Sequence, residues 1–253
     1  MKTVALLSGG KDSLFNMFLA TKEGHEIVAI ANLKPHSSEK DELDSYMYQT
    51  VGHQAIELIA KALNKPLFRA DITQTAKIKD LSYIEPSDGN DEVEQLYNLL
   101  KQMKDKHGVD FSAVCVGAIA YSYQKSRVES ICGRLDLTML AYLWNDDQDK
   151  LLQRMIDNNF DAILIKVACL GLTKEHIGKS IKEMQSHLRH LHEVYGCNVC
   201  GEGGEYESLV LDCPLYEKRL RIEESDVICH SEDLFAPVYF MRPVKLSLID
   251  KAS

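Results

Sequence analysis

The chain has 253 residues, of which 45% are apolar and 26% are charged, the balance of a soluble globular protein. Its 38 acidic and 29 basic residues give a formal net charge of −9, which disfavours nucleic acid as a stable partner because phosphate binding needs a basic surface. The most apolar stretch, residues 161–173, is too short to span a bilayer and contains a lysine. We therefore expect no membrane attachment.

The seven cysteines follow no disulfide-framework spacing. The apolar run at residues 3–7 stops at Ser8 and is too short for the core of a secretory leader. We therefore expect reduced thiols and a cytoplasmic location.

Short apolar runs alternate with segments of helical periodicity through the first half of the chain. We expect strands at residues 3–7, 26–33, 66–72, 113–117 and 137–143, and helices at residues 13–24, 44–63, 91–106 and 124–133. This alternation predicts an α/β fold with a parallel sheet covered on both faces. Ligands of such sheets bind at the carboxyl ends of the strands.

The alternation loosens near residues 144–147. Beyond them we expect helices at 147–158 and 174–195, a buried strand within 161–173, and short strands at 207–212, 218–222, 227–230 and 238–248. The sequence thus predicts a nucleotide-binding domain over residues 1–144 and a smaller α+β domain over residues 145–253.

The glycine loop, Ser8–Ser13 (S-G-G-K-D-S), separates the first strand from the first helix. Glycines let backbone N–H groups converge on one point, and the helix directs its positive end there. Lys11 adds a cation, and Asp12 is suited to hold Mg²⁺ beside phosphates. The loop is therefore predicted to bind a polyphosphate through Ser8, Gly9, Gly10, Lys11, Asp12 and Ser13. The alternative is a tight turn in which the serines cap the helix.

The acidic segment, Cys200–Ser208 (C-G-E-G-G-E-Y-E-S), crowds three glycines, three carboxylates and a phenol together. Such a cluster suits binding a cation, orienting Mg²⁺ or accepting a proton from an amine. An acidic hairpin turn that leads into the next strand explains the same residues, and the segment alone does not decide between the two.

The motif S-G-G-x-D-S after the first strand resembles the pyrophosphate loop of the N-type ATP pyrophosphatases, which cleave ATP between the α- and β-phosphates. With the acidic segment and the stretches at 42–53, 141–144, 211–215 and 235–238, the whole chain resembles the diphthine–ammonia ligase (ATP-binding domain 4) family. One departure is Tyr121-Ser122, where Ser-Asp is common in that family.

The resemblance implies a nucleotide-binding domain like the adenine nucleotide alpha hydrolases (the HUP fold). It implies amidation of diphthine on translation elongation factor 2 with ammonia, through an acyl-adenylate, with ATP and Mg²⁺ as cofactors and AMP and pyrophosphate as products. The catalytic candidates are Lys11, Asp12, Glu202 and Glu205. Further nucleotide contacts are expected from Asn32 and Gly117, and substrate contacts from Asp44, Tyr48, Gln124, Gly203, Gly204, Tyr206 and Glu207.

Two other functions are compatible with the same motifs. One is a tRNA-modifying ligase that also adenylates its substrate, and the other is a non-catalytic module that binds an adenine nucleotide. Cys197 and Cys200 are spaced like a zinc or redox pair, but no second ligand pair follows them at a suitable spacing. Lys166 either extends its ammonium from a strand end to water or contacts a phosphate.

Overall fold

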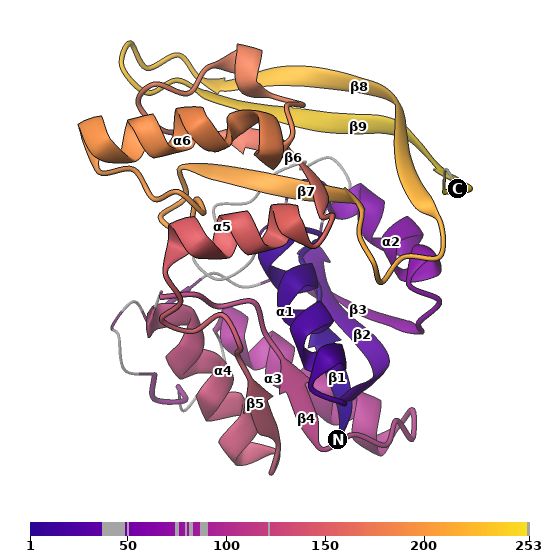
Figure 1. The fold of residues 1–253 in the computed structure, drawn as a ribbon. Helices are drawn as coiled ribbons and strands as arrows, with labels where there is room; N and C mark the ends of the chain where they lie inside the picture. The colour runs from indigo at the N-terminus through magenta and orange to yellow at the C-terminus, as the bar shows by residue number, and fades with distance from the viewer. Residues whose placement is uncertain are drawn as a thin grey trace. The chain divides into compact units, whose positions relative to one another are not determined.

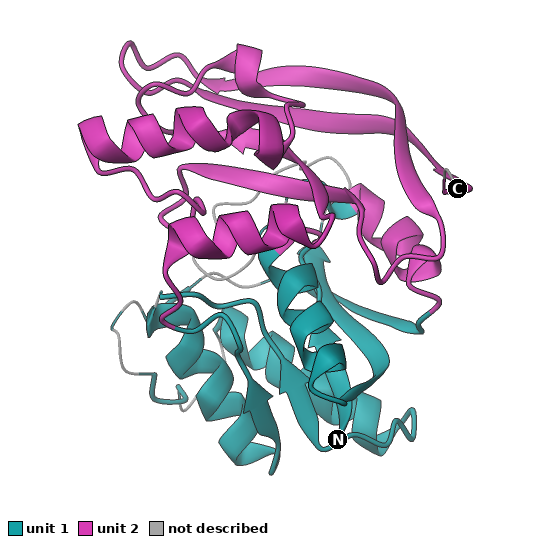
Figure 2. Cartoon of the chain, in the orientation of Figure 1, with its two compact units in different colours: residues 1–8, 12–53, 65–144 teal, residues 9–11, 54–64, 145–253 magenta. Residues whose placement is uncertain are grey.

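The computed structural model describes residues 1–36, 49, 51–73, 76–78, 80, 83–86, 91–120 and 122–251. They form two compact units (Figure 2). The first unit comprises residues 1–8, 12–53 and 65–144, and the second comprises residues 9–11, 54–64 and 145–253. The units are therefore not two contiguous halves, because two short pieces from the first part of the chain join the second unit.

The first unit contains a five-stranded sheet in the order β3-β2-β1-β4-β5, and every neighbouring pair is parallel (Figure 1). The strands are β1 (Lys2–Leu6), β2 (Glu26–Pro35), β3 (Leu67–Ile72), β4 (Ala113–Cys115) and β5 (Thr138–Leu140). The helices that connect them are α1 (Lys11–Lys22), α3 (Glu92–Asp105) and α4 (Ser122–Arg134). The predicted α/β fold with a parallel sheet is confirmed.

The core of the first unit follows from the apolar patterns of its elements. β1 and β2 are apolar on both faces, as strands covered on both sides must be, and α3 turns one apolar stripe toward them. Asp91 begins α3 by accepting a hydrogen bond from the backbone N–H of Val93 at 3.0 Å. The cluster includes Val4, Ala29, Ala31, Leu33, Val93, Leu96, Leu100, Met103, Val128 and Ile131.

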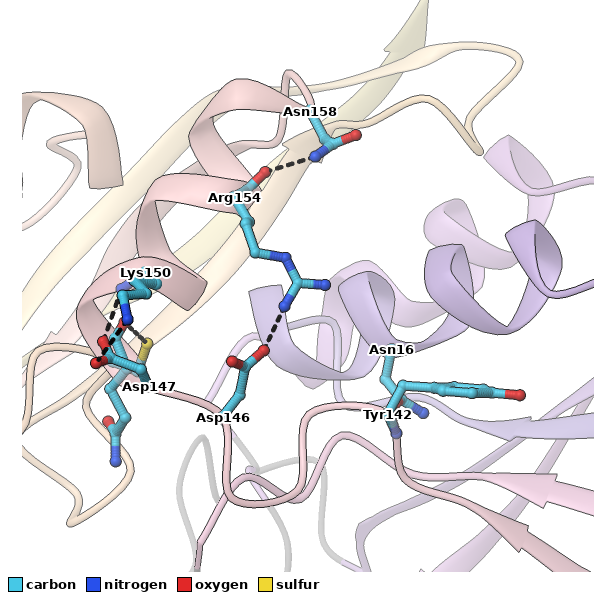
Figure 3. A network of polar contacts seen from close by, with 9 residues as sticks. Asn16, Tyr142, Asp146, Asp147, Lys150, Arg154 and Asn158 are labelled. Atoms are coloured by element: carbon cyan, nitrogen blue, oxygen red, sulfur yellow. Dashed lines mark hydrogen bonds and ion pairs between the residues drawn. The ribbon is translucent and has the colours of Figure 1, made fainter.

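A buried amide side chain joins α1 to the ends of two strands. Asn16 is fully buried, and its Oδ1 accepts a hydrogen bond from the backbone N–H of Tyr142 at 2.7 Å (Figure 3). Its Nδ2 donates to the carbonyl oxygen of Leu140 at 2.9 Å and lies 2.8 Å from the sulfur of Cys115. Because a buried amide costs free energy unless it is paired, these bonds fix where α1 lies against β4 and β5.

The second unit contains a four-stranded antiparallel sheet in the order β7-β6-β9-β8. Its strands are β6 (Asp161–Val167), β7 (Tyr206–Asp212), β8 (Arg219–Ser231) and β9 (Val238–Ile249). Its α-helices are α2 (Ile56–Ala62), α5 (Gln148–Asp157) and α6 (Ile181–Tyr195), and the short 3₁₀ helices are η1 (His53–Ala55) and η2 (Lys174–His176). Asp147 caps α5 by accepting from the backbone N–H of Lys150, and Arg154 pairs with Asp146 (Figure 3).

The helix predicted over residues 174–195 is wrong in its first part. Gly178 has a φ of +83° and donates its N–H to the carbonyl oxygen of Leu164 in β6 at 2.8 Å. Helix α6 begins only after Ser180, whose hydroxyl accepts from the N–H of Glu183 while the Glu183 carboxylate accepts from the N–H of Ser180. The hydrogen bond between Gly178 and β6 therefore interrupts the helical spacing of apolar residues that runs through 174–195.

The two strands predicted at 218–222 and 227–230 are one strand, β8. The polar run Glu223–Asp226 looks like a break in the sequence, but β9 provides a continuous antiparallel partner across it. The register shifts between Ile222 and Glu224 and again before Ser225, so bulges absorb the irregularity. Two smaller differences are that β5 ends at Leu140, and that the helix expected over 44–63 is described only from His53, as η1 followed by α2.

No helix within the described part of the chain has both the length and the apolarity needed to cross a membrane.

The first testable prediction concerns Asn16. Asn16→Leu removes three polar contacts and leaves the backbone N–H of Tyr142 without the acceptor it has in the wild type, whereas the Leu140 carbonyl keeps the N–H of Val116. The substitution should lower the free energy of unfolding by about 2–4 kcal/mol. Urea denaturation of the purified chain measures this. The control is Glu23→Gln, on the exposed turn after α1, which should change the free energy by less than about 0.5 kcal/mol. Equal stabilities for the two variants would contradict the account.

Candidate functional site

The glycine loop has a backbone that only glycine adopts without strain at its second residue. Gly9 has a φ of +87°, and its carbonyl oxygen accepts a hydrogen bond from the N–H of Val210 in β7 at 3.0 Å. A Cβ at this position would also lie 3.2 Å from the Cδ1 of Ile56. The turn therefore requires glycine. Gly10 follows it, is buried, and precedes α1.

Lys11 brings the two candidate motifs together within the second unit. Its side chain is buried, with a relative exposure of 2%, and its Nζ donates to the carbonyl oxygen of Cys200 at 2.5 Å. The ammonium also lies 5.0 Å from the centre of the Tyr206 ring, a cation–π distance. The backbone N–H of Lys11 donates to the hydroxyl of Ser208 at 3.1 Å. The lysine of the glycine loop is thus bound to both ends of the acidic segment.

The acidic segment folds as two consecutive turns. The side-chain oxygen of Asn198 accepts from the N–H of Cys200 at 3.0 Å, and its carbonyl accepts from the N–H of Gly201 at 3.0 Å. The N–H of Gly204 then donates to the carbonyl of Gly201 at 3.1 Å. The phenol of Tyr206 donates to the carbonyl of Val199 at 2.9 Å and closes the segment on itself. Asn198, which the sequence analysis did not single out, therefore fixes the peptide whose carbonyl holds Lys11.

The three carboxylates of this segment have different surroundings. Glu207 forms an ion pair with Lys166, its register partner in β6, at 3.2 Å. Glu202 accepts a hydrogen bond from the amide of Gln148 at 3.4 Å. Glu205 accepts from the N–H of Asn198 at 2.8 Å through Oε1, whereas its Oε2 has no hydrogen-bond partner within the described part of the chain. Lys166 is therefore a partner of Glu207 rather than a snorkelling lysine at a strand end.

Gly203 leaves room for one of these carboxylates. A Cβ at Gly203 would lie 3.0 Å from both carboxylate oxygens of Glu205. Gly204 has a φ of +85° and continues the turn toward Glu205. A side chain at position 203 would therefore crowd the carboxylate of Glu205.

The serines of the glycine loop belong to the first unit and contact each other. The hydroxyls of Ser8 and Ser13 are 3.2 Å apart, and the N–H of Ser8 donates to the Ser13 hydroxyl at 3.3 Å. Asp12 lies in the first turn of α1, and a Cβ at Gly117 would lie only 2.6 Å from the Asp12 carbonyl carbon. Gly117, which follows β4, is therefore needed for close packing against the start of α1. Direct contact of these residues with a nucleotide stays a prediction.

Asn32 is buried near the end of β2. Its Nδ2 donates to the carbonyl of Leu7 at 2.8 Å, and its Oδ1 accepts from the Nε of Arg69 at 2.8 Å. A second nitrogen of Arg69 donates to the carbonyl of His53 at 3.1 Å. Arg69 is a cation that the sequence analysis missed, because it lies inside a strand pattern and its pairing with Asn32 follows only from the β2–β3 register.

Three further predicted substrate residues stay predictions. Asp44 and Tyr48 lie outside the described residues. Gln124 lies half-buried on α4, in the first unit. On the same helix Arg127 is fully buried and donates to the carbonyls of Ile78 and Asp80 at 2.6 and 3.1 Å, so α4 also anchors the described part of the segment before α3.

Six of the seven cysteines are buried, and Cys229 is exposed. Cys197 and Cys200 are buried, and the thiol of Cys200 donates to the carbonyl of Gln148 at 3.1 Å. Burial, together with the neighbouring thiol of Cys197, raises the pKa of Cys169 to about 12. Among the described residues, no group of three or more His, Cys, Asp or Glu side chains could hold a metal ion.

Known proteins resemble this chain over its whole length. A family model described as the diphthamide synthase N-terminal domain matches residues 1–139, and one described as the diphthamide synthase C-terminal domain matches residues 147–238. The chain is 53% identical to the diphthine–ammonia ligase of Danio rerio over 253 residues, which cover 99% of this chain and 98% of that protein. It is 49% identical to the diphthine–ammonia ligase of Homo sapiens over 256 residues, covering 100% of this chain and 94% of that protein.

A weaker likeness joins the chain to a solved structure, the predicted subunit of a tRNA methyltransferase from Methanocaldococcus jannaschii. It covers 85% of this chain and 98% of that one at 16% identity and a TM-score of 0.37, values too low to carry an argument. The family models and the relatives near 50% identity are much stronger evidence than this structure, because they match nearly every helix and strand described above. They confirm the resemblance drawn from the glycine loop and the acidic segment: the chain belongs to the diphthamide synthase family.

Proposed function

We propose that this chain is a ligase that amidates diphthine with ammonia at the expense of ATP, giving diphthamide, AMP and pyrophosphate. The observation that carries the proposal is the bond from Lys11 in the glycine loop to the Cys200 carbonyl in the acidic segment. It joins residues 9–11 of the glycine loop to the carboxylate-rich segment within the second unit. The names of the relatives in zebrafish and human support the same reaction.

The chemistry needs an activated carboxylate. A carboxylate resists attack by ammonia because it is anionic and its oxygen is a poor leaving group, whereas an acyl-adenylate releases AMP readily. Forming the adenylate expels pyrophosphate, whose growing charge must be stabilised. Gly9 shapes the loop, and the positive end of α1, a helix of 12 residues, follows it directly.

The residues of the glycine loop suit the binding of ATP together with a magnesium ion. Mg²⁺ is usually held by one or two carboxylates together with phosphate oxygens and waters. Asp12 in the first turn of α1 supplies one such carboxylate, and no set of three metal ligands stands ready elsewhere among the described residues. Asp12 would therefore hold the ion jointly with the nucleotide, and the ion would offset phosphate charge.

Lys11 supplies a positive charge next to the glycine loop. The carbonyl of Cys200 and the ring of Tyr206 orient its ammonium, and a cation at this position stabilises the charge that grows on pyrophosphate. We therefore assign Lys11 to charge stabilisation and the Cys200 carbonyl to its positioning.

We assign Glu205 to accept a proton from ammonia after attack. The contact described for its carboxylate is an uncharged backbone N–H, that of Asn198, whereas Glu207 pairs with the ammonium of Lys166, which makes that carboxylate a weaker base. Glu202, fixed by Gln148, is assigned to orienting the ammonium ion. Asp44, Tyr48 and Gln124 remain candidates for the pocket of the diphthine side chain, and translation elongation factor 2 remains the proposed protein that bears it.

The second testable prediction concerns Lys11. Lys11→Ala should lower the turnover number by about 10²–10³-fold, the range found when one charged transition-state contact is lost. Amide formation on the diphthine-bearing protein, followed by mass spectrometry, measures it. The control is Lys22→Ala at the other, exposed end of α1, which should keep near-normal turnover. If K11A is as active as K22A, the loop is only a turn.

The third testable prediction separates the two half-reactions. Glu205→Gln removes a base but keeps the size of the side chain, so it should preserve exchange of labelled pyrophosphate into ATP and form little amide. Glu193→Gln, an exposed change on α6, should leave both activities intact. Equal loss of both activities in E205Q would instead place Glu205 in the binding of ATP or Mg²⁺.

The fourth testable prediction concerns the nitrogen donor. The neutral ammonia molecule is the nucleophile, so the rate at a fixed, subsaturating ammonium concentration should rise with pH as the fraction of NH₃ rises. Initial rates across a pH series, with ATP and protein substrate saturating, test this. Robust turnover on glutamine with ammonium scavenged from the assay would refute direct use of ammonia.

A further inference from the structure

The turn that joins β8 to β9 presents two large apolar side chains to solvent. Leu234 is 92% exposed and Phe235 is 75% exposed. They are adjacent in the segment 232–237, between the end of β8 and the start of β9. Neighbouring exposed apolar residues of this size are uncommon on a surface unless they bind something.

The turn is held by its own hydrogen bonds. The carboxylate of Asp233 accepts from the backbone N–H of Phe235 at 2.8 Å and from that of Ala236 at 2.9 Å. These two bonds lower the pKa of Asp233, as expected when backbone donors favour the ionised form. Leu234 and Phe235 are therefore carried by a capped turn, which reduces the conformational entropy that binding would cost.

The strand register places this turn at the same end of the sheet as the acidic segment. Val167 in β6 pairs with Tyr206 in β7 on one side and with Tyr239 in β9 on the other, and Tyr239 pairs with Cys229 in β8. The acidic segment directly precedes Tyr206, and the segment 232–237 directly precedes β9. Both connections therefore leave the sheet from one end, as the strands of the second unit show in Figure 1.

This end of the sheet is acidic. Residues 231–241 contain Glu232 and Asp233 and no lysine or arginine, and residues 196–208 contain three glutamates and no lysine or arginine. The segment 168–180, which follows β6 at the same end, adds two lysines and one glutamate, so acids still outnumber bases in the three connections. Lys166, the nearby cation on β6, is paired with Glu207. Such a surface repels nucleic acid and anionic lipid, and it complements a protein surface that carries lysines and arginines.

We infer that Leu234 and Phe235 anchor the protein substrate. The partner surface is one with an apolar recess rimmed by basic side chains, and the inference rests on the proposed function, under which that partner is the diphthine-bearing protein. An enzyme that modifies one side chain of a large protein has to hold the body of that protein while the side chain enters the site. A rigid aromatic and aliphatic anchor supplies most of the binding energy in such contacts, and the acids speed association.

The experiment compares a Leu234→Ser, Phe235→Ser double variant with the wild-type chain in amidation of the diphthine-bearing protein. The double variant should raise the KM for that protein about tenfold or more while kcat at saturation stays within about twofold of wild type. The matched control is Val244→Ser, which changes an exposed apolar residue (53%) on the same hairpin away from the turn, and it should leave KM unchanged. The wild-type KM should also rise with salt.

The outcomes separate this inference from the proposed function. An active wild type with an unchanged KM in the double variant overturns the anchor and leaves the ligase standing. A wild-type chain that makes no amide overturns the proposed function. In that case the wild type and the double variant are each titrated with the diphthine-bearing protein, and equal Kd values refute the role of Leu234 and Phe235 in binding it. A wild-type dimer that the double variant converts to a monomer would show that a second copy covers the turn, which also overturns the inference.

Discussion

The bond between the Lys11 ammonium and the Cys200 carbonyl is the interaction on which the candidate site depends. Burying a lysine ammonium costs free energy unless hydrogen-bond acceptors surround it. Three features of the structure bring such an acceptor, the Cys200 carbonyl, to Lys11. Gly9 must turn the loop, Ser208 must hold the Lys11 backbone, and Asn198 must fix the peptide of Cys200. Each comes from a different part of the chain, so the site forms only when the second unit is folded.

The acids of the acidic segment have contacts of their own. The three glutamates follow Cys200 closely in the sequence. Glu207 is drawn away by Lys166 across the β6–β7 pair, and Glu205 is held by the backbone of Asn198. Lys11 of the glycine loop and the carboxylates of the acidic segment thus belong to one structural unit, and these are the two kinds of group that the proposed adenylation and amidation would use.

Most helices and strands of the chain were predictable from the spacing of apolar residues and from the helix-capping residues. The parallel strands of the first unit read as short apolar runs, and α3 and α5 begin at their aspartate caps. The break before α6 was not predictable, because it depends on Gly178 pairing with Leu164, and neither was β8 as one strand, because its continuity comes from β9. In the site, the glycine loop and the acidic segment were evident from residue types. Their union through Lys11, and the roles of Asn198 and Arg69, depend on contacts between residues far apart in the sequence.

In the proposed reaction one chain couples ATP cleavage to amide formation. The most direct measurement follows the purified chain with ATP, ¹⁵N-ammonium and the diphthine-bearing protein, and counts amide, AMP and pyrophosphate in the same reaction. The account predicts equal amounts of all three and ¹⁵N in the new amide. Formation of ADP and phosphate, or AMP release without ¹⁵N in the protein, would contradict it.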